Sequence, residues 1–107
     1  DDNNLIELTT YNELGEITWR ETSVFDENGN ETIKHEYDRS ELWKVKKYKY
    51  DDNNNRIEKS TKYANSEDIT IIKTKYLLFD KNGNWTRKYD ISEDGEREYQ
   101  KRIIEYY

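Results

Sequence analysis

Hydrophobic and polar residues alternate along most of this chain with a period of two, which is the period of a β-strand. A clear example begins at Ile17, where Trp19 and Phe25 fall on one face and Arg20 and Val24 fall on the other. No segment shows a clear 3.6-residue period, which an amphipathic helix would require. The pattern therefore predicts an all-β chain.

Short polar stretches separate these segments, and each has the chemistry of a hairpin turn. Residues 25–30 (Phe-Asp-Glu-Asn-Gly-Asn) and 79–84 (Phe-Asp-Lys-Asn-Gly-Asn) are near copies, with looser relatives at residues 11–15 and 50–54. Asp bonds its own backbone and Gly accepts a left-handed conformation, so we expect type I turns followed by G1 bulges. Aromatic residues recur about every 13 residues, which matches one strand plus one turn. They are Tyr11, Phe25, Tyr37, Tyr50, Tyr63, Tyr76 and Tyr89.

These signals together predict the fold class. We expect one repeat-built domain over residues 1–107, folded as an antiparallel meander of about eight strands built from repeated β-hairpins. The strands are expected to form a single twisted sheet or a partly rolled open sheet. Ile69–Phe79 is the longest apolar segment and is predicted to be the best-buried strand, and a last strand is predicted over Arg97–Tyr107. The chain contains no Met, so we expect that residue 1 is not the native start. A removed secretion signal and a domain excised from a longer chain both fit.

Composition narrows the partner classes. A hydrophobic content of 32% and a charged content of 39% approach the range of disordered chains, but 10 Tyr and 3 Trp favour an ordered sheet. The net charge of -6 argues against nucleic acid as the main partner, because a phosphate backbone attracts a basic surface. The basic run Lys44–Lys49 is interpreted as a solvated strand face. No apolar run is long enough to span a membrane, and the absence of Cys excludes disulfides.

Exposed aromatic side chains are the main candidates for ligand binding. Trp and Tyr on a β surface stack on sugar rings or line a peptide site, and we nominate Trp19, Trp43, Tyr48 and Trp85. The alternative is that these rings form the thin core of a sheet that is poor in aliphatic residues. Unpaired strand edges also suit self-association.

Catalytic and metal sites are not expected. The turns that begin at Asp26 and Asp80 resemble the start of a calcium loop, but their twelfth positions are Tyr37 and Ile91 instead of the Glu that an EF-hand needs. The single His35 has no Ser-His-Asp spacing around it. With 24 acidic residues, pairs of carboxylates arise by chance, so a glycoside hydrolase is the weakest of the alternatives. We predict a chain without a cofactor that is not an enzyme.

The turn motifs also resemble a known family. Residues 48–54 (Tyr-Lys-Tyr-Asp-Asp-Asn-Asn), with Phe25-Asp26 and Phe79-Asp80, are similar to the tyrosine-aspartate (YD, or RHS-type) repeats of bacterial surface and toxin-delivery proteins. The resemblance implies a β-hairpin array in a secreted or cell-envelope protein of a bacterium. It also implies a role in glycan or protein recognition, or in shell building. The acidic net charge supports an alternative function, that of an interaction or immunity-type protein that binds a basic partner.

Overall fold

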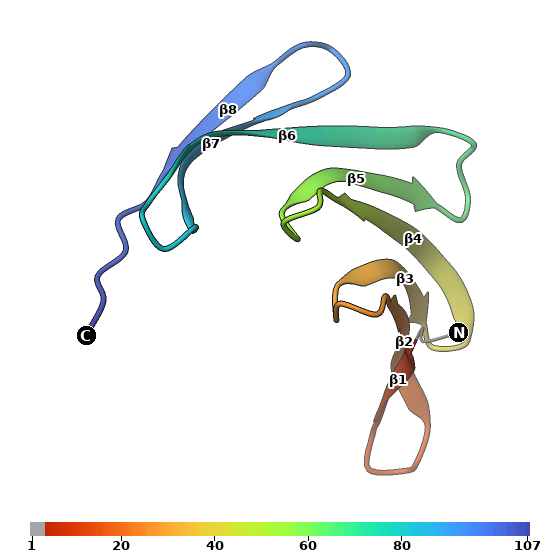
Figure 1. The fold of residues 1–107 in the computed structure, drawn as a ribbon. Helices are drawn as coiled ribbons and strands as arrows, with labels where there is room; N and C mark the ends of the chain where they lie inside the picture. Colours follow the sequence, from red (N-terminus) through yellow and green to blue (C-terminus); the bar gives the residue numbers. More distant parts are fainter. Residues whose placement is uncertain (1–3) are drawn as a thin grey trace.

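The computed structural model describes residues 4–107 and consists of one open sheet of eight strands. Each strand pairs with the next in antiparallel fashion, in the order β1 to β8, which confirms the predicted meander (Figure 1). The ribbon is bent into an arc with β1 and β8 at its two ends. The strands are β1 (Asn4–Tyr11), β2 (Ile17–Phe25), β3 (Glu31–Asp38), β4 (Glu41–Tyr50), β5 (Arg56–Tyr63), β6 (Ile69–Phe79), β7 (Trp85–Ile91) and β8 (Arg97–Lys101).

The repeated turns are built on one hydrogen-bond pattern. In the β2–β3 turn, Oδ1 of Asp26 accepts hydrogen bonds from the backbone N–H groups of Asn28 and Asn30, both at 2.9 Å. The fourth turn residue, Gly29, has a φ of 82°, and the strand register shifts at Phe25 as a G1 bulge requires. The predicted turn type is therefore confirmed.

Three further turns repeat this pattern around a side-chain oxygen of Asn12, Asp51 or Asp80. At the position equivalent to Gly29, the β4–β5 turn carries Asn54, with a φ of 65°. Asn tolerates the left-handed region better than other side chains do, so the turn keeps its shape without Gly.

Tyrosine hydroxyls connect the hairpins beside these turns. The hydroxyl of Tyr50, at the end of β4, donates to the backbone carbonyl of Glu31 at 2.7 Å. The hydroxyl of Tyr76 in β6 donates to the carbonyl of Arg56, also at 2.7 Å. Each bond joins an even-numbered strand to the first residue of the strand before it, next to the bulge where the regular ladder ends. Burial raises the pKa of both tyrosines, so both hydroxyls remain donors at neutral pH.

The sheet has a single layer and lacks an apolar core. No hydrophobic side chain of residues 4–107 is buried, and the two buried residues are Ser23 and Glu36. The radius of gyration is 17.0 Å, whereas a compact chain of this length has a value of about 13 Å. The aromatic rings of residues 4–107 are therefore at most partly covered by neighbours on their own face, and none is enclosed between two layers.

Two sequence predictions about the strands are wrong. β6 is not the best-buried strand, because no second layer covers it: Ile69, Leu78 and Phe79 are 51%, 52% and 46% exposed. The better-covered strands are β2 and β3, each of which has one buried and one exposed residue. The last strand ends at Lys101 instead of Tyr107.

After β8, the chain remains attached to the sheet by specific bonds. The backbone N–H of Arg102 donates to the carbonyl of Thr86 at 2.9 Å, and its guanidinium donates to the carbonyl of Trp85 at 2.7 Å. The hydroxyl of Tyr106 then contacts Asp80 in the β6–β7 turn. These contacts hold the terminal segment against the turn without forming a further stretch of strand.

Candidate functional site

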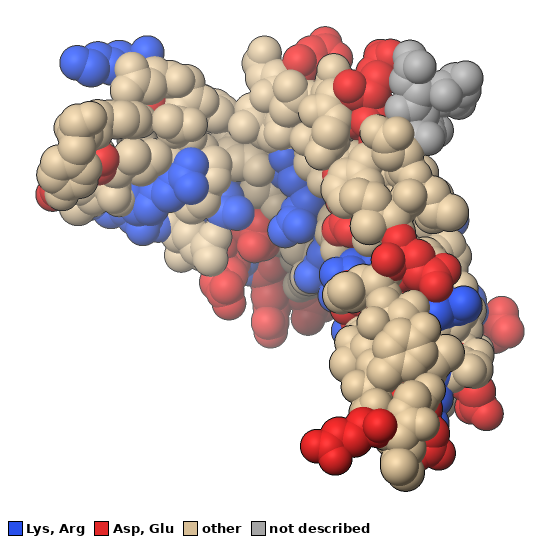
Figure 2. Space-filling model, turned by 90° about the horizontal axis from the view of Figure 1, so that it is seen from below, with Lys and Arg blue, Asp and Glu red and all other residues tan. Residues whose placement is uncertain are grey.

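Cross-strand pairing assigns every strand side chain to one of two faces, because directly paired residues point the same way. One face, which we call the paired face, carries Glu21, Lys34, Glu36 and Lys46 on β2, β3 and β4. Lys34 Nζ lies 3.2 Å from Glu21, and Lys46 Nζ lies 3.1 Å from Glu36. Glu21 and Glu36 therefore each have a cation beside them. Figure 2 shows Lys and Arg gathered along the inner side of the bent sheet, with Asp and Glu nearby.

Electrostatics on the paired face follow from these contacts. The indole N–H of Trp19 donates to Glu21 at 2.9 Å. That hydrogen bond, followed by the interactions with Lys34, lowers the pKa of Glu21 against the opposing effect of burial. The Lys46 ammonium lies off the line of a hydrogen bond to Oε2 of Glu36, so this buried oxygen has an ionic partner only.

The opposite face is strongly basic from β4 to β8, and we call it the basic face. The register of β4 to β8 assigns eight cations to it but one carboxylate, that of Glu58. Lys62 is half-buried, and the other seven cations are exposed. The eight cations are Lys47, Lys49, Lys62, Lys73, Lys75, Arg87, Arg97 and Lys101.

A groove of about 490 Å³ lies on the basic face across β3 to β6. Its aliphatic lining comes from Val45, Ile69 and Ile71, and Lys47 and Lys62 lie beside them. The volume falls within the usual range of ligand sites. The sequence interpretation of Lys44–Lys49 as one solvated strand face missed this site, because Lys44 and Lys46 lie on the paired face whereas Lys47 and Lys49 lie on the basic face.

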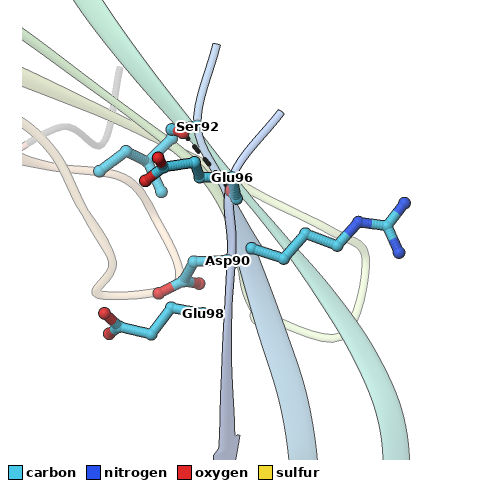
Figure 3. Close-up of a pocket in the computed structure, with 6 residues that line it drawn as sticks. Asp90, Ser92, Glu96 and Glu98 are labelled. Carbon is cyan, nitrogen blue, oxygen red and sulfur yellow. Dashed lines mark hydrogen bonds between the residues drawn. The ribbon is translucent and has the colours of Figure 1, made fainter. Parts of the chain in front are cut away.

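A second, acidic cleft of about 290 Å³ lies beside β7 and β8. Asp90 and Glu98 face each other directly across these strands, and Figure 3 shows their carboxylates pointing to the same side. Asp90 accepts a hydrogen bond from the hydroxyl of Thr74 at 2.7 Å, and Ser92 donates to the carbonyl of Glu96 at 3.4 Å. Within residues 4–107, no group of three or more acidic, His or Cys side chains is placed to hold a metal ion.

The four nominated aromatic residues lie on three different strands. Trp19 is on β2, Trp43 and Tyr48 are on β4, and Trp85 is on β7. Three strand spacings separate β4 from β7, or about 14 Å. No two of the four rings contact each other among the ring pairs of the described residues. A single sugar ring therefore cannot bridge Tyr48 and Trp85.

Neighbouring side chains already contact several of these aromatic rings. The guanidinium of Arg102 lies 3.9 Å from the centre of the Trp85 ring, and the ammonium of Lys88 lies 4.6 Å from it. Trp43 packs edge to face against Tyr63 at 5.3 Å. Trp43 nevertheless remains 44% exposed, so it retains surface for a ligand.

His35 lies on the basic face and contributes to the lining of its groove. Its ring stacks on that of Tyr37 at 6.5 Å, and it pairs across the strands with Thr22 and Val45. The arrangement gives His35 a packing role in the groove.

Comparison with protein-family models, with curated proteins and with solved structures gives no match for this chain. Residues 4–107 also contain no helix with the length and apolarity of a membrane span.

Proposed function

We propose that this chain is a non-catalytic binding or structural module, in which a sheet of hairpins presents its side chains for recognition or for shell building. The observation that supports this proposal is the open, single-layer sheet. Its accessible surface is 8297 Å² for a mass of 13.1 kDa, whereas a compact protein of that mass exposes about 6,400 Å². Such a sheet offers wide surfaces to a partner, while an enzyme needs an enclosed and dry site.

The repeated hairpin turns also support the assignment of this chain to repeat-built surface proteins. The turn around Asp26 recurs around Asp51 and Asp80 with the same hydrogen bonds. Together with the resemblance to tyrosine-aspartate repeats, this recurrence supports a secreted or cell-envelope bacterial protein that recognises glycans or proteins, or that builds a shell from further hairpins.

A glycan array, a peptide panel and sedimentation velocity together test this proposal. Binding on either panel supports recognition, and concentration-dependent self-association without any ligand supports the structural role. Release of reducing ends from a polysaccharide, abolished by Asp90→Asn or Glu98→Gln, would refute a non-catalytic role. A monomer that binds nothing on either panel would remove both forms of the proposal.

The placement of the acidic residues favours a second candidate, an interaction or immunity-type protein that binds a basic partner. Twelve of the 24 acidic residues lie in the connections between strands, against two of the 18 basic ones, Arg39 and Lys81. Titration with a labelled Arg-rich peptide tests this candidate. Binding should weaken when exposed turn carboxylates such as Asp52 and Glu27 are replaced together by their amides.

A further inference from the structure

The basic face differs sharply from the chain as a whole. The chain has a net charge of -6, yet Glu58 is the one carboxylate opposite eight cations on this face from β4 to β8. Glu58 already forms an ion pair with Lys49 at 3.3 Å. Within residues 4–107, none of the other seven cations has a carboxylate within 4.0 Å. This face therefore attracts an anionic partner despite the overall charge.

The groove in this face also has an aliphatic lining, so a partner that fits it needs apolar surface as well as negative charge. Val45 pairs with Lys62, which pairs with Ile69, so an aliphatic side chain flanks the lysine on each side. Ile69 is 51% exposed. Covering it would remove apolar surface from water and stabilise a complex. A partner that fits the groove thus combines negative charge with aliphatic surface.

The lining of the groove distinguishes between classes of anion. No aromatic side chain other than that of His35 lines it. Sugar rings and nucleic-acid bases stack on Trp, Tyr or Phe, so neither finds a suitable platform here. A peptide with Ile, Leu or Val side chains between Glu or Asp residues matches both the aliphatic lining and the lysines beside it.

We infer that the groove of the basic face, lined by Val45, Ile69 and Ile71 between Lys47 and Lys62, is a docking site for an acidic peptide segment that carries aliphatic side chains. This inference rests on the proposed function as a binding module and names its partner class. The ammonium groups contact the carboxylates, and the aliphatic lining receives the apolar side chains.

Fluorescence anisotropy with defined peptides tests the inference. The probe is a fluorescein-labelled peptide of three Glu-Glu-Ile repeats, and the matched control peptide has three Glu-Glu-Gly repeats with the same charge. We expect the Ile peptide to bind at least about fivefold more tightly, because Ile side chains bury apolar area that Gly lacks. Affinity should fall as salt rises, since exposed ion pairs are screened.

Two charge-reversal variants locate the site. Lys47→Glu with Lys62→Glu should weaken binding of the Ile peptide by at least about tenfold, because like charges then face each other. Arg39→Glu with Lys81→Glu makes the same change in net charge within turns, and it should leave affinity within about twofold. If the first pair disturbs folding, Lys47→Glu alone is used, because Lys47 is exposed. Ile69→Ser should reduce the preference for Ile over Gly.

Several outcomes would overturn the inference. They are equal affinity for the two peptides, no binding of either peptide, or unchanged affinity for the Ile peptide in the groove variant, Lys47→Glu with Lys62→Glu. Tighter binding of heparin fragments or oligo(dT), lost in the groove variant, would assign the face to another class of polyanion. If a glycan or peptide binds the groove variant with the same affinity as the original chain, the binding-module proposal stands and the groove assignment fails.

Discussion

The two tyrosine hydroxyls that connect neighbouring hairpins provide a direct test of how this sheet is stabilised. Tyr50→Phe and Tyr76→Phe each remove one oxygen and keep the aromatic ring. Each lost hydroxyl donates to a backbone carbonyl at 2.7 Å. The carbonyls belong to Glu31 and Arg56, the first residues of β3 and β5, where the turns meet the sheet.

The expected cost follows from the value of a single hydrogen bond. A neutral hydrogen bond contributes about 0.5–1.5 kcal/mol net, so each variant should lose about 1 kcal/mol of unfolding free energy. β5 separates the strands that carry the two tyrosines, and the hydroxyls share no partner. The losses should therefore add to about 2 kcal/mol in the double variant. This is a large fraction of the stability of a small domain, particularly one without an apolar core.

Urea denaturation followed by far-ultraviolet circular dichroism measures these losses. The control is Tyr11→Phe, because Tyr11 is 59% exposed and its hydroxyl makes no hydrogen bond among the described residues. If the free energies of Tyr50→Phe and Tyr76→Phe change no more than that of Tyr11→Phe, the hydroxyls do not stabilise the sheet. A double variant that loses much less than the sum would show that the two sites are coupled.

Three further measurements probe a turn, a half-buried carboxylate and a cross-strand pair. Gly83→Val should lose about 1 kcal/mol or more of stability, because Gly83 has a φ of 83°; Asn82→Val in the same turn is the control, and an equal loss would contradict the strain argument. Glu21 has its pKa lowered from 4.5 by its indole hydrogen bond and nearby ammonium groups. Its contribution is therefore present at neutral pH and lost as the pH falls below that value, and Glu21→Gln should flatten the acid limb of stability against pH. Glu98→Lys should raise the unfolding free energy by about 0.2–1 kcal/mol, because it places a cation opposite Asp90. A loss of stability would indicate that the like-charged pair is held by other contacts.

The sequence predicted the connections better than the surfaces, for a physical reason. A turn depends on a few adjacent residues, and Asp26 with Gly29 is sufficient to specify one. The limits of β6 were predicted correctly for the same reason, because polar residues punctuate both of its ends. Burial depends instead on whether a second layer exists, and alternation in one strand carries no information about that. The exposure of Phe79 could not be predicted for this reason.

The basic groove was missed because it requires the register of several strands at once. Lys47 and Lys62 lie 15 positions apart in the sequence, and they meet because β4 and β5 pair around the turn at Asp51. A signal was present in each strand, since Lys47 and Lys49 are two positions apart, as are Lys73 and Lys75, so each pair shares a face. Only the hairpin register shows that both pairs lie on the same face.

The overall acidity of the chain has a local cause that affects how its charge is interpreted. Asp26, Asp51 and Asp80 each use a carboxylate oxygen to accept two backbone N–H groups. Turn chemistry requires this role with or without a partner. Part of the net charge of -6 is thus structural, and it is weak support for a basic partner. Apart from Lys49, which pairs with Glu58, the cations of the basic face have no carboxylate within 4.0 Å among residues 4–107. The clustering of charge on this face is therefore the stronger indication of binding.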